Sequence, residues 1–187
     1  MPIGWWVLAL DGQNALLLSA RVLDCQKYNT KEVKTTWEKC SLRKWLNNTF
    51  LKKAFTAEEQ KAILLTELDN SYYTKYNNKT KKWEGVTNKT KDKVFLLRDS
   101  EAQDCLQVGQ VHSIEPSDYA VSQGAVASSG SQGCQWWLRT CFGTAQDYAA
   151  VYDNDKPGGS ERMYPVNWDN IGVCPAIWVN LDADVLK

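Results

Sequence analysis

Residues suited to ligand recognition gather between residues 140 and 171, where Tyr, Trp and Phe are interspersed with Asn, Asp, Thr and Gly. Aromatic side chains with few rotatable bonds lose little entropy on binding, and Asn, Asp and Thr supply hydrogen bonds that orient a ligand. This combination predicts a surface that binds a protein or a glycan. The alternative is that the aromatic side chains plug the core beneath a long loop. The residues that we expect on the binding surface are Phe142, Thr144, Asp147, Tyr148, Tyr152, Asn154, Tyr164, Asn167 and Trp168.

The sequence offers few residues for catalysis. His112 is the single histidine of the chain, and it lies between Val111 and Ser113, outside any recognisable nucleophile motif. The chain also lacks the glycine-rich phosphate-binding loops and the H-E-x-x-H zinc motif. We therefore expect no catalytic residues and a protein that is not an enzyme.

Oxygen ligands for a cation occur at residues 153–158, where Asp153, Asn154 and Asp155 resemble the start of a calcium loop. The run lacks the distal bidentate Glu of such loops, and Pro157 alters the turn. Ordinary turn chemistry explains the same residues. We expect no metal ion and no other cofactor, with calcium at this run as the alternative.

The chain contains 6 cysteines, with no C-x-x-C motif and a single histidine, so a Cys/His zinc cluster is not expected. An apolar content of 43% and 9 Trp are ample for a core that needs no covalent staples. The sequence therefore favours reduced, structural cysteines. One or more disulfides stay the alternative, and the sequence does not choose a pairing.

The charges of the chain balance, with 22 basic and 22 acidic residues. This balance removes any whole-chain argument for a nucleic-acid partner or an anionic membrane. Lysines between residues 75 and 93 are interleaved with Tyr76 and Trp83, a pattern that RNA- or phosphate-binding arms use. A solvated excursion kept soluble by its lysines explains this stretch more simply. We expect no nucleic-acid partner.

No apolar run approaches the roughly 20 residues that span a bilayer, so we expect no membrane insertion. The chain starts with strand-like sequence after Met1, without the basic and apolar regions of a signal peptide. Either the protein is cytosolic, or the chain is an internal domain or mature fragment of a longer exported protein. The localisation is therefore open.

Strands and short helices must position the expected binding segment. Two aromatic and apolar runs, residues 135–139 and 172–181, have the composition of core strands and frame the segment. The sequence between them shows no sustained strand or helix period, which predicts a long irregular segment on a rigid scaffold. At the other end of the chain, Asp11-Gly12 between two apolar runs predicts a β-hairpin over residues 5–19.

Helix signals follow the hairpin. Ser41 is the expected N-cap of a helix with an apolar stripe through residues 42–50, and Thr56 with Glu59 forms a capping box for a second helix. A third helix is expected from Asp99. Because these elements lack a β-α-β rhythm, we predict a single α+β domain over residues 1–187. The residues expected in its core are Trp45, Leu46, Phe95, Leu97, Leu138, Ile177 and Val179.

Ordered motifs along most of the chain resemble those of an uncharacterised bacterial domain family. That family carries LDCxxYN, W..CxLRxWLN, DKVFLLS, WWLRSPG and GVRPALWL signatures. The matching stretches here are LDCQKYN (23–29), TWEKCSLRKWLNNTF (36–50), FTAEEQKAI (55–63), DKVFLL (92–97), QWWLRT (135–140) and GVCPAIWVNL (172–181).

The family resembles, at its C-terminal end, the C-type-lectin-like fold of formylglycine-generating enzymes and of variable proteins diversified by retroelements in phages and bacteria. The resemblance implies a C-type-lectin-like domain that displays residues 139–171 as a variable, ligand-binding segment, in an adhesin or receptor at a bacterial surface or on a phage. The chain departs from the family pattern at Thr140-Cys141-Phe142-Gly143 and at Cys174, which replaces an arginine.

Two other functions stay open. One is a copper-dependent oxidase of the formylglycine-generating type, which needs two thiolates close together and open to a groove, with Cys134, Cys141 and Cys174 as the cysteines to inspect. The other is a structural domain of a larger surface protein.

Overall fold

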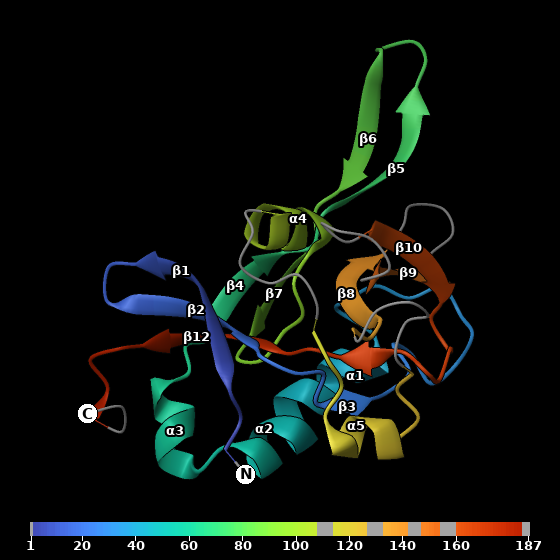
Figure 1. Ribbon diagram of the computed structural model, residues 1–187. Coiled ribbons are helices and arrows are strands. Elements are labelled where there is room, and N and C mark those ends of the chain that lie inside the picture. The colour runs from blue at the N-terminus through green and yellow to red at the C-terminus, as the bar shows by residue number, and fades with distance from the viewer. Residues whose placement is uncertain (1, 108–113, 127–132, 142–146, 154–159, 185–187) are drawn as a thin grey trace.

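The structure is a computed structural model, and it describes residues 2–107, 114–126, 133–141, 147–153 and 160–184. Runs of strands and runs of short helices follow one another along the chain, without a β-α-β repeat (Figure 1). The architecture is therefore a mixture of small sheets with helices packed at their edges and ends. Among the described residues, no helix combines the length and the hydropathy that a bilayer span requires.

The N-terminal hairpin and the C-terminal strand form one three-stranded sheet in the order β1-β2-β12. Its strands are β1 (Trp5–Asp11), β2 (Asn14–Ser19) and β12 (Ala176–Asn180). Gly12 has a φ of +57°, a backbone conformation that glycine adopts without the steric cost of a Cβ atom, so the Asp-Gly step closes the hairpin as expected. Antiparallel pairing of β2 with β12 ties the two ends of the sequence together and confirms that they share a core.

A second sheet has five strands in the order β10-β9-β8-β11-β3. Three of the strands follow one another in antiparallel pairs: β8 (Trp136–Cys141), β9 (Tyr148–Asp153) and β10 (Ser160–Pro165). Two short strands, β11 (Gly172–Val173) and β3 (Asp24–Cys25), complete the sheet. A Cβ atom at Gly172 would lie 2.4 Å from Val22 Cγ1, so only glycine lets these two segments approach so closely.

The segment between the two framing strands is not irregular, which corrects the sequence-based expectation. Strands β9 and β10 both lie within it, and β9 is buried from Ala149 to Asp153. A strand covered on both faces has no polar–apolar alternation to read. Two consecutive alanines also lower its apparent strand propensity, since Ala is depleted in strands.

A nearly continuous helical stretch packs beside the sheets. It consists of α1 (Ser41–Trp45), a π-helical turn at Leu46–Phe50, and α2 (Leu51–Ala54). The N-cap is Cys40, whose Sγ accepts from Arg43 N at 3.4 Å, and not Ser41. Ser41 Oγ instead accepts from Thr30 N at 3.0 Å, which draws the preceding loop onto the helix.

The shorter helices match their sequence signals. In α3 (Ala57–Ala62) the capping box of Thr56 and Glu59 is present in both directions, which confirms the prediction. Helix α4 (Asp99–Gln107) begins at the expected residue. Helix α5 (Asp118–Ser122) is capped by the Ser117 side chain, which accepts from Ala120 N.

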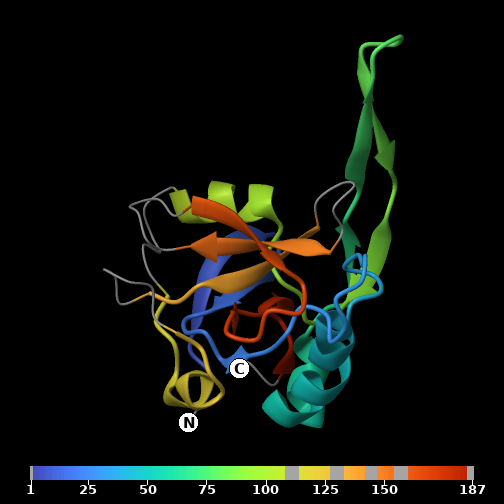
Figure 2. The same ribbon diagram turned by 90° about the vertical axis from the view of Figure 1, so that its right-hand side faces the viewer.

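The lysine-rich stretch forms two successive strand pairs. Strands β4 (Thr66–Asp69) and β7 (Lys89–Asp92) pair at its base, and β5 (Tyr72–Asn77) pairs with β6 (Lys82–Val86) beyond them. Figures 1 and 2 show the β5–β6 hairpin projecting well clear of the rest of the molecule. The stretch extends away from the rest of the domain, as the sequence suggested, and it is an ordered β-ribbon of paired strands.

The expected core is largely correct. The residues found buried as expected are Leu46, Phe95, Leu97, Leu138, Ile177 and Val179. Trp45 is only half-buried, which corrects that prediction. Its indole lies against the ring of Phe50 at the wall of a groove, with ring centroids 5.4 Å apart.

Candidate ligand-binding surface

The expected binding residues fall into two groups. Phe142, Thr144 and Asn154 lie outside the described residues. The others lie on β9, on β10 and on the turns beside them. Strand β10 is the outer strand of the five-stranded sheet, so this group occupies one edge of the scaffold (Figure 1). The sheet thus brings together parts of the segment that are up to 21 residues apart, from Asp147 to Trp168.

Two aromatic side chains of this group are exposed. Tyr148 at the start of β9 is 37% exposed, and Trp168 after β10 is 43% exposed. The indole of Trp168 meets the ring of Tyr164 edge to face, with centroids 5.5 Å apart and an angle of 68° between the planes. Such aromatic pairs are more favourable than their buried area alone implies. The pair therefore forms a firm, partly exposed aromatic ledge.

The hydroxyl of Tyr164 fixes this ledge to the sheet. Tyr164 Oη accepts a hydrogen bond of 3.1 Å from Gln135 Nε2, which also donates to Asp153 Oδ2 at 2.8 Å. Arg162 Nε lies 2.9 Å from the same carboxylate oxygen, and the Asp153 side chain is fully buried. A buried carboxylate paired with a guanidinium and an amide is a strong positioning element.

Tyr152 does not belong to the surface, which corrects its prediction. The residue is 5% exposed, and its ring stacks on Trp136 with centroids 5.1 Å apart. The two residues are direct cross-strand neighbours of β8 and β9. Their side chains therefore lie on the same face of the sheet, inside the core. For Tyr152, the alternative of core packing is the correct one.

The remaining polar candidates contact neighbouring loops. Asn167 Nδ2 donates to Glu32 Oε2 at 3.1 Å, which extends the surface toward the loop that precedes α1. Asp147 O accepts from Val166 N at 2.8 Å, so this bond joins the two flanks of the β9–β10 pair. Sequence reasoning missed Glu32, which is distant in sequence, and Met163, which is 43% exposed on β10.

Glu161 is a titratable residue on β10 that the sequence did not single out. Burial, together with the nearby negative charge of Asp99, raises the pKa of Glu161 to about 7. Its Oε1 atom is buried and has no hydrogen-bond partner among the described residues. Glu161 lies opposite Tyr152 in the strand register, so it faces the covered side of the sheet.

The calcium alternative depends partly on Asp153. Its carboxylate is fully buried and already binds Arg162 and Gln135. Residues 154–158 of the run lie outside the described residues. Among the residues that the structure describes, no group of three or more His, Cys, Asp and Glu side chains could hold a metal ion.

The thiols relevant to a copper site are buried. Burial raises the pKa of Cys134 and of Cys174 to about 12, and that of Cys141 to about 11. Cys174 Sγ lies 3.2 Å from Ser19 Oγ, and Cys141 Sγ lies 3.0 Å from Tyr28 Oη. These three cysteines are free, as are Cys25 and Cys40.

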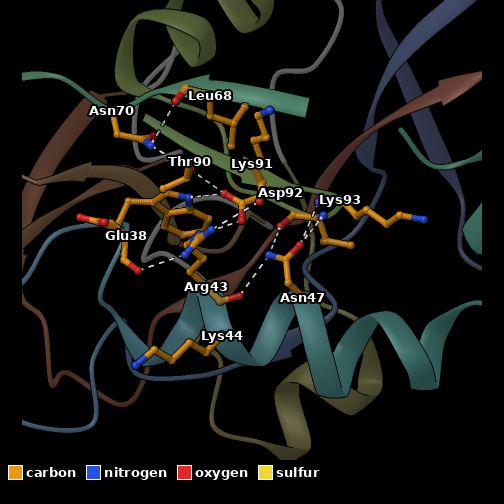
Figure 3. A network of polar contacts seen from close by, with 12 residues as sticks. Glu38, Arg43, Lys44, Asn47, Leu68, Asn70, Thr90, Lys91, Asp92 and Lys93 are labelled. Atoms are coloured by element: carbon orange, nitrogen blue, oxygen red, sulfur yellow. Dashed lines mark hydrogen bonds and ion pairs between the residues drawn. The ribbon is translucent and has the colours of Figure 1, made fainter. Parts of the chain in front are cut away.

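A buried polar network joins α1 and the π-helical turn to the base of the β-ribbon (Figure 3). Asp92 at the end of β7 accepts from Trp37 Nε1 at 3.0 Å, from Thr90 Oγ1 at 2.7 Å and from Arg43 Nε at 2.7 Å. Asn47, in the π-helical turn, accepts from Lys93 N at 2.9 Å. A π-turn in a helix often marks a site that another segment engages.

Asn70 connects this network to a second buried cation. Its Nδ2 donates to Thr90 Oγ1, and its Oδ1 accepts from Arg139 Nε, each at 3.0 Å. Arg139 also donates to both carboxylate oxygens of Glu101, each at 2.5 Å. Burial would raise the pKa of Glu101, but the hydrogen bonds and charge of Arg139 outweigh it and hold that pKa below its usual value. The network fixes β8, the strand that pairs with β9 beneath the candidate surface.

A large groove lies away from this edge. It is lined by segments distant in sequence, namely residues 2–4, 20–26, 45–54 and 117–119. None of the expected binding residues belongs to it. The signal that could have drawn attention to it was Asp24, an acid placed between the apolar residues Leu23 and Cys25.

Comparison with known proteins identifies a family for most of the chain. A family model described as Domain of unknown function (DUF6273) matches residues 12–181. No curated protein and no solved structure matches the chain.

Proposed function

The chain belongs to the family described as Domain of unknown function (DUF6273), and we propose that it is a non-catalytic ligand-binding domain. Its binding surface is the edge formed by β9, β10 and the turn that follows, with Tyr148, Tyr164, Asn167 and Trp168 as contact residues. The partner is a protein or a glycan. A C-type-lectin-like fold, and diversification of this segment by a retroelement, are part of the same proposal.

The observation that carries the proposal is the fixed yet exposed aromatic ledge. Tyr164 and Trp168 pack edge to face, and Gln135 holds the Tyr164 hydroxyl at 3.1 Å. Trp168 still exposes 43% of its surface. A side chain that is already held in place loses little entropy when a partner covers it. Tyr and Trp in such positions are the residue types that dominate binding energies.

The scaffold beneath the ledge also fits a display function. Strand β8 is buried over most of its length, and β9 is buried from Ala149 to Asp153. Variation at the outer turns would leave these strands in place, because rigid elements commonly carry variable binding loops. The burial of Cys134, Cys141 and Cys174 favours this reading over copper chemistry, which needs two thiolates open to a groove.

The experiment is a screen of the purified chain on a glycan array and against a displayed peptide library, followed by titration of the best ligand. Tyr148→Ala and Tyr164→Ala are expected to weaken binding by about 1–3 kcal/mol, the scale of an interface hot spot. Tyr148→Ala should melt close to the parent chain, whereas Tyr164→Ala also loses the hydrogen bond from Gln135 and should melt at a lower temperature while it stays folded. Unchanged affinity in both variants would assign the binding to another surface and refute the proposal.

A further inference from the structure

A second, separate feature of the molecule suggests a small-molecule site. A groove of about 900 Å³ lies between the N-terminal segment, the loop that leads into β3, the α1–α2 stretch and the start of α5. Sites for small organic molecules have volumes of roughly 300–1,000 Å³ and walls that are mostly apolar, with a few fixed polar groups. The walls of this groove include Ile3, Leu23, Trp45 and Phe50.

Asp24 is the fixed polar group of this groove. The residue is 6% exposed and lines the groove, so its carboxylate is largely removed from water. Oδ1 accepts from Cys25 N at 2.7 Å and from Gln26 Nε2 at 3.1 Å. Oδ2 accepts no hydrogen bond from the described residues. It is not among the buried oxygens that lack a partner, so it opens onto the groove, where the donor of a ligand can take the place of water.

The surroundings of Asp24 act on the pKa of its carboxyl group in both directions. Burial raises the pKa of Asp24, while the hydrogen bonds from Gln26 and Cys25 and the positive charge of Lys53 act in the opposite direction. The carboxylate is thus positioned by two donors and attracted to one cation, with Oδ2 available to a ligand.

Lys53 supplies a free positive charge on the same groove. Its Nζ lies 5.6 Å from the ring centroid of Tyr119, a cation–π distance, and it makes no ion pair with a carboxylate of the described residues. The other cation of the groove, Arg21, is already paired with Glu115 at 3.6 Å. The groove therefore offers Asp24 Oδ2 and the Lys53 ammonium group beside an apolar and aromatic wall. The exposed Asp118 also lines the groove, at the start of α5.

We propose that this groove binds a small zwitterion of the amino-acid class, a free amino acid or a dipeptide with apolar side chains. The ligand's ammonium group donates to Asp24 Oδ2, and its carboxylate pairs with Lys53 Nζ. Its side chains lie against Trp45 and Phe50. Complementary charges of this kind select a ligand over one that carries a single charge, because the wrong ligand leaves a groove charge unpaired. The site is independent of the surface formed by β9 and β10.

The test uses the dipeptide L-phenylalanyl-L-leucine and two capped forms, the N-acetyl derivative without an ammonium group and the C-terminal amide without a carboxylate. Isothermal titration of the full chain is expected to show binding of the free dipeptide. Each capped form should bind about tenfold more weakly, since it loses one charge-assisted hydrogen bond.

Two variants assign the charges to residues. Asp24→Asn should abolish the preference for the free dipeptide over the N-acetyl form, and Lys53→Gln should abolish the preference over the amide. Lys53 is exposed, so its substitution is expected to leave folding intact even if that at Asp24 does not. Lys52→Gln, on the neighbouring exposed lysine outside the groove, is the matched control and should bind like the parent chain.

Three results would contradict a zwitterion site in this groove. No binding of the free dipeptide at millimolar concentration would overturn the proposal. Equal binding of all three peptides, or equal effects of Lys52→Gln and Lys53→Gln, would also overturn it. Binding of glucose with no binding of the dipeptide would reassign the groove to another ligand class. Trp168→Ala should leave dipeptide binding unchanged, which separates this test from that of the surface formed by β9 and β10.

Discussion

Tyr164 and Trp168 meet edge to face at the outer edge of the five-stranded sheet, with ring centroids 5.5 Å apart. One ring is anchored through its hydroxyl to Gln135, and the other is 43% exposed. The pair thus combines the order of a core contact with the accessibility of a binding surface. Asn167, which precedes Trp168, donates a hydrogen bond from its side-chain amide to Glu32 on a loop that is distant in sequence.

Truncation of a buried core side chain should greatly lower the free energy of unfolding. Leu46 and Ile177 are 0% and 2% exposed, so Leu46→Ala or Ile177→Ala should lower the free energy of unfolding by about 2–5 kcal/mol. Urea denaturation measures the loss. Leu10→Ala, at a position that is 68% exposed, is the control and should change stability by less than about 0.5 kcal/mol. Comparable losses at Leu10 and Ile177 would mean that the burial is misassigned.

The hydrogen bonds of the buried Arg139 predict that a lysine at this position would make the fold less stable. The guanidinium binds Glu101 with two parallel hydrogen bonds and Asn70 with a third, and an ammonium group cannot reproduce this fork. Arg139→Lys should therefore cost about 2–4 kcal/mol of unfolding free energy.

Arg21→Lys provides the control for the network. Arg21 makes a surface ion pair with its side chain 56% exposed, and its replacement should cost less than about 1 kcal/mol. If chemical denaturation gives the same small loss for both substitutions, Arg139 does not depend on its fork of hydrogen bonds.

Glu161 predicts a pH dependence of stability. Its pKa is raised from 4.5 to about 7 by burial and by Asp99, so the folded chain binds this proton more tightly than the unfolded chain does. The resulting stability is fully present below about pH 4.5 and is lost as the pH rises through about 7. Glu161→Gln should therefore melt like the parent chain at pH 4. At pH 8 it should be more stable, by about 1 kcal/mol because Glu161 is partly solvated.

Glu67→Gln is the matched control for this effect. Hydrogen bonding to Lys89 lowers the pKa of Glu67, which is the opposite direction, so its substitution should give no gain in stability at pH 8. A melting curve of Glu161→Gln that parallels the parent chain at every pH would contradict the shifted pKa.

Local sequence signals predicted the parts of the fold that local chemistry controls. The Asp11-Gly12 step gave a hairpin because positive φ is needed at that turn, and Thr56 with Glu59 gave a helix start because the two residues satisfy each other's amides. The signals failed at β9, where Ala149 and Ala150 carry little strand propensity and burial on both faces hides the period.

The sites depend on long-range contacts, so the sequence predicted them only in part. Tyr148 and Trp168 were correctly placed at the surface, but Tyr152 is buried because the register sets it opposite Trp136. The groove around Asp24 could not be read from any single stretch, since its walls come from segments that are more than 90 residues apart, such as Asp24 and Tyr119.

The affinity of Trp168→Ala for the best ligand of the screen, measured beside Trp6→Ala, tests the binding surface most directly. Trp6 is 44% exposed, about as much as Trp168, and it lies on β1 in the three-stranded sheet. The account predicts that Trp168→Ala weakens binding by about 1–3 kcal/mol with little change in melting temperature, and that Trp6→Ala binds like the parent chain. Equal affinities for the two variants, or a Trp168→Ala variant that loses binding only because it unfolds, would contradict it.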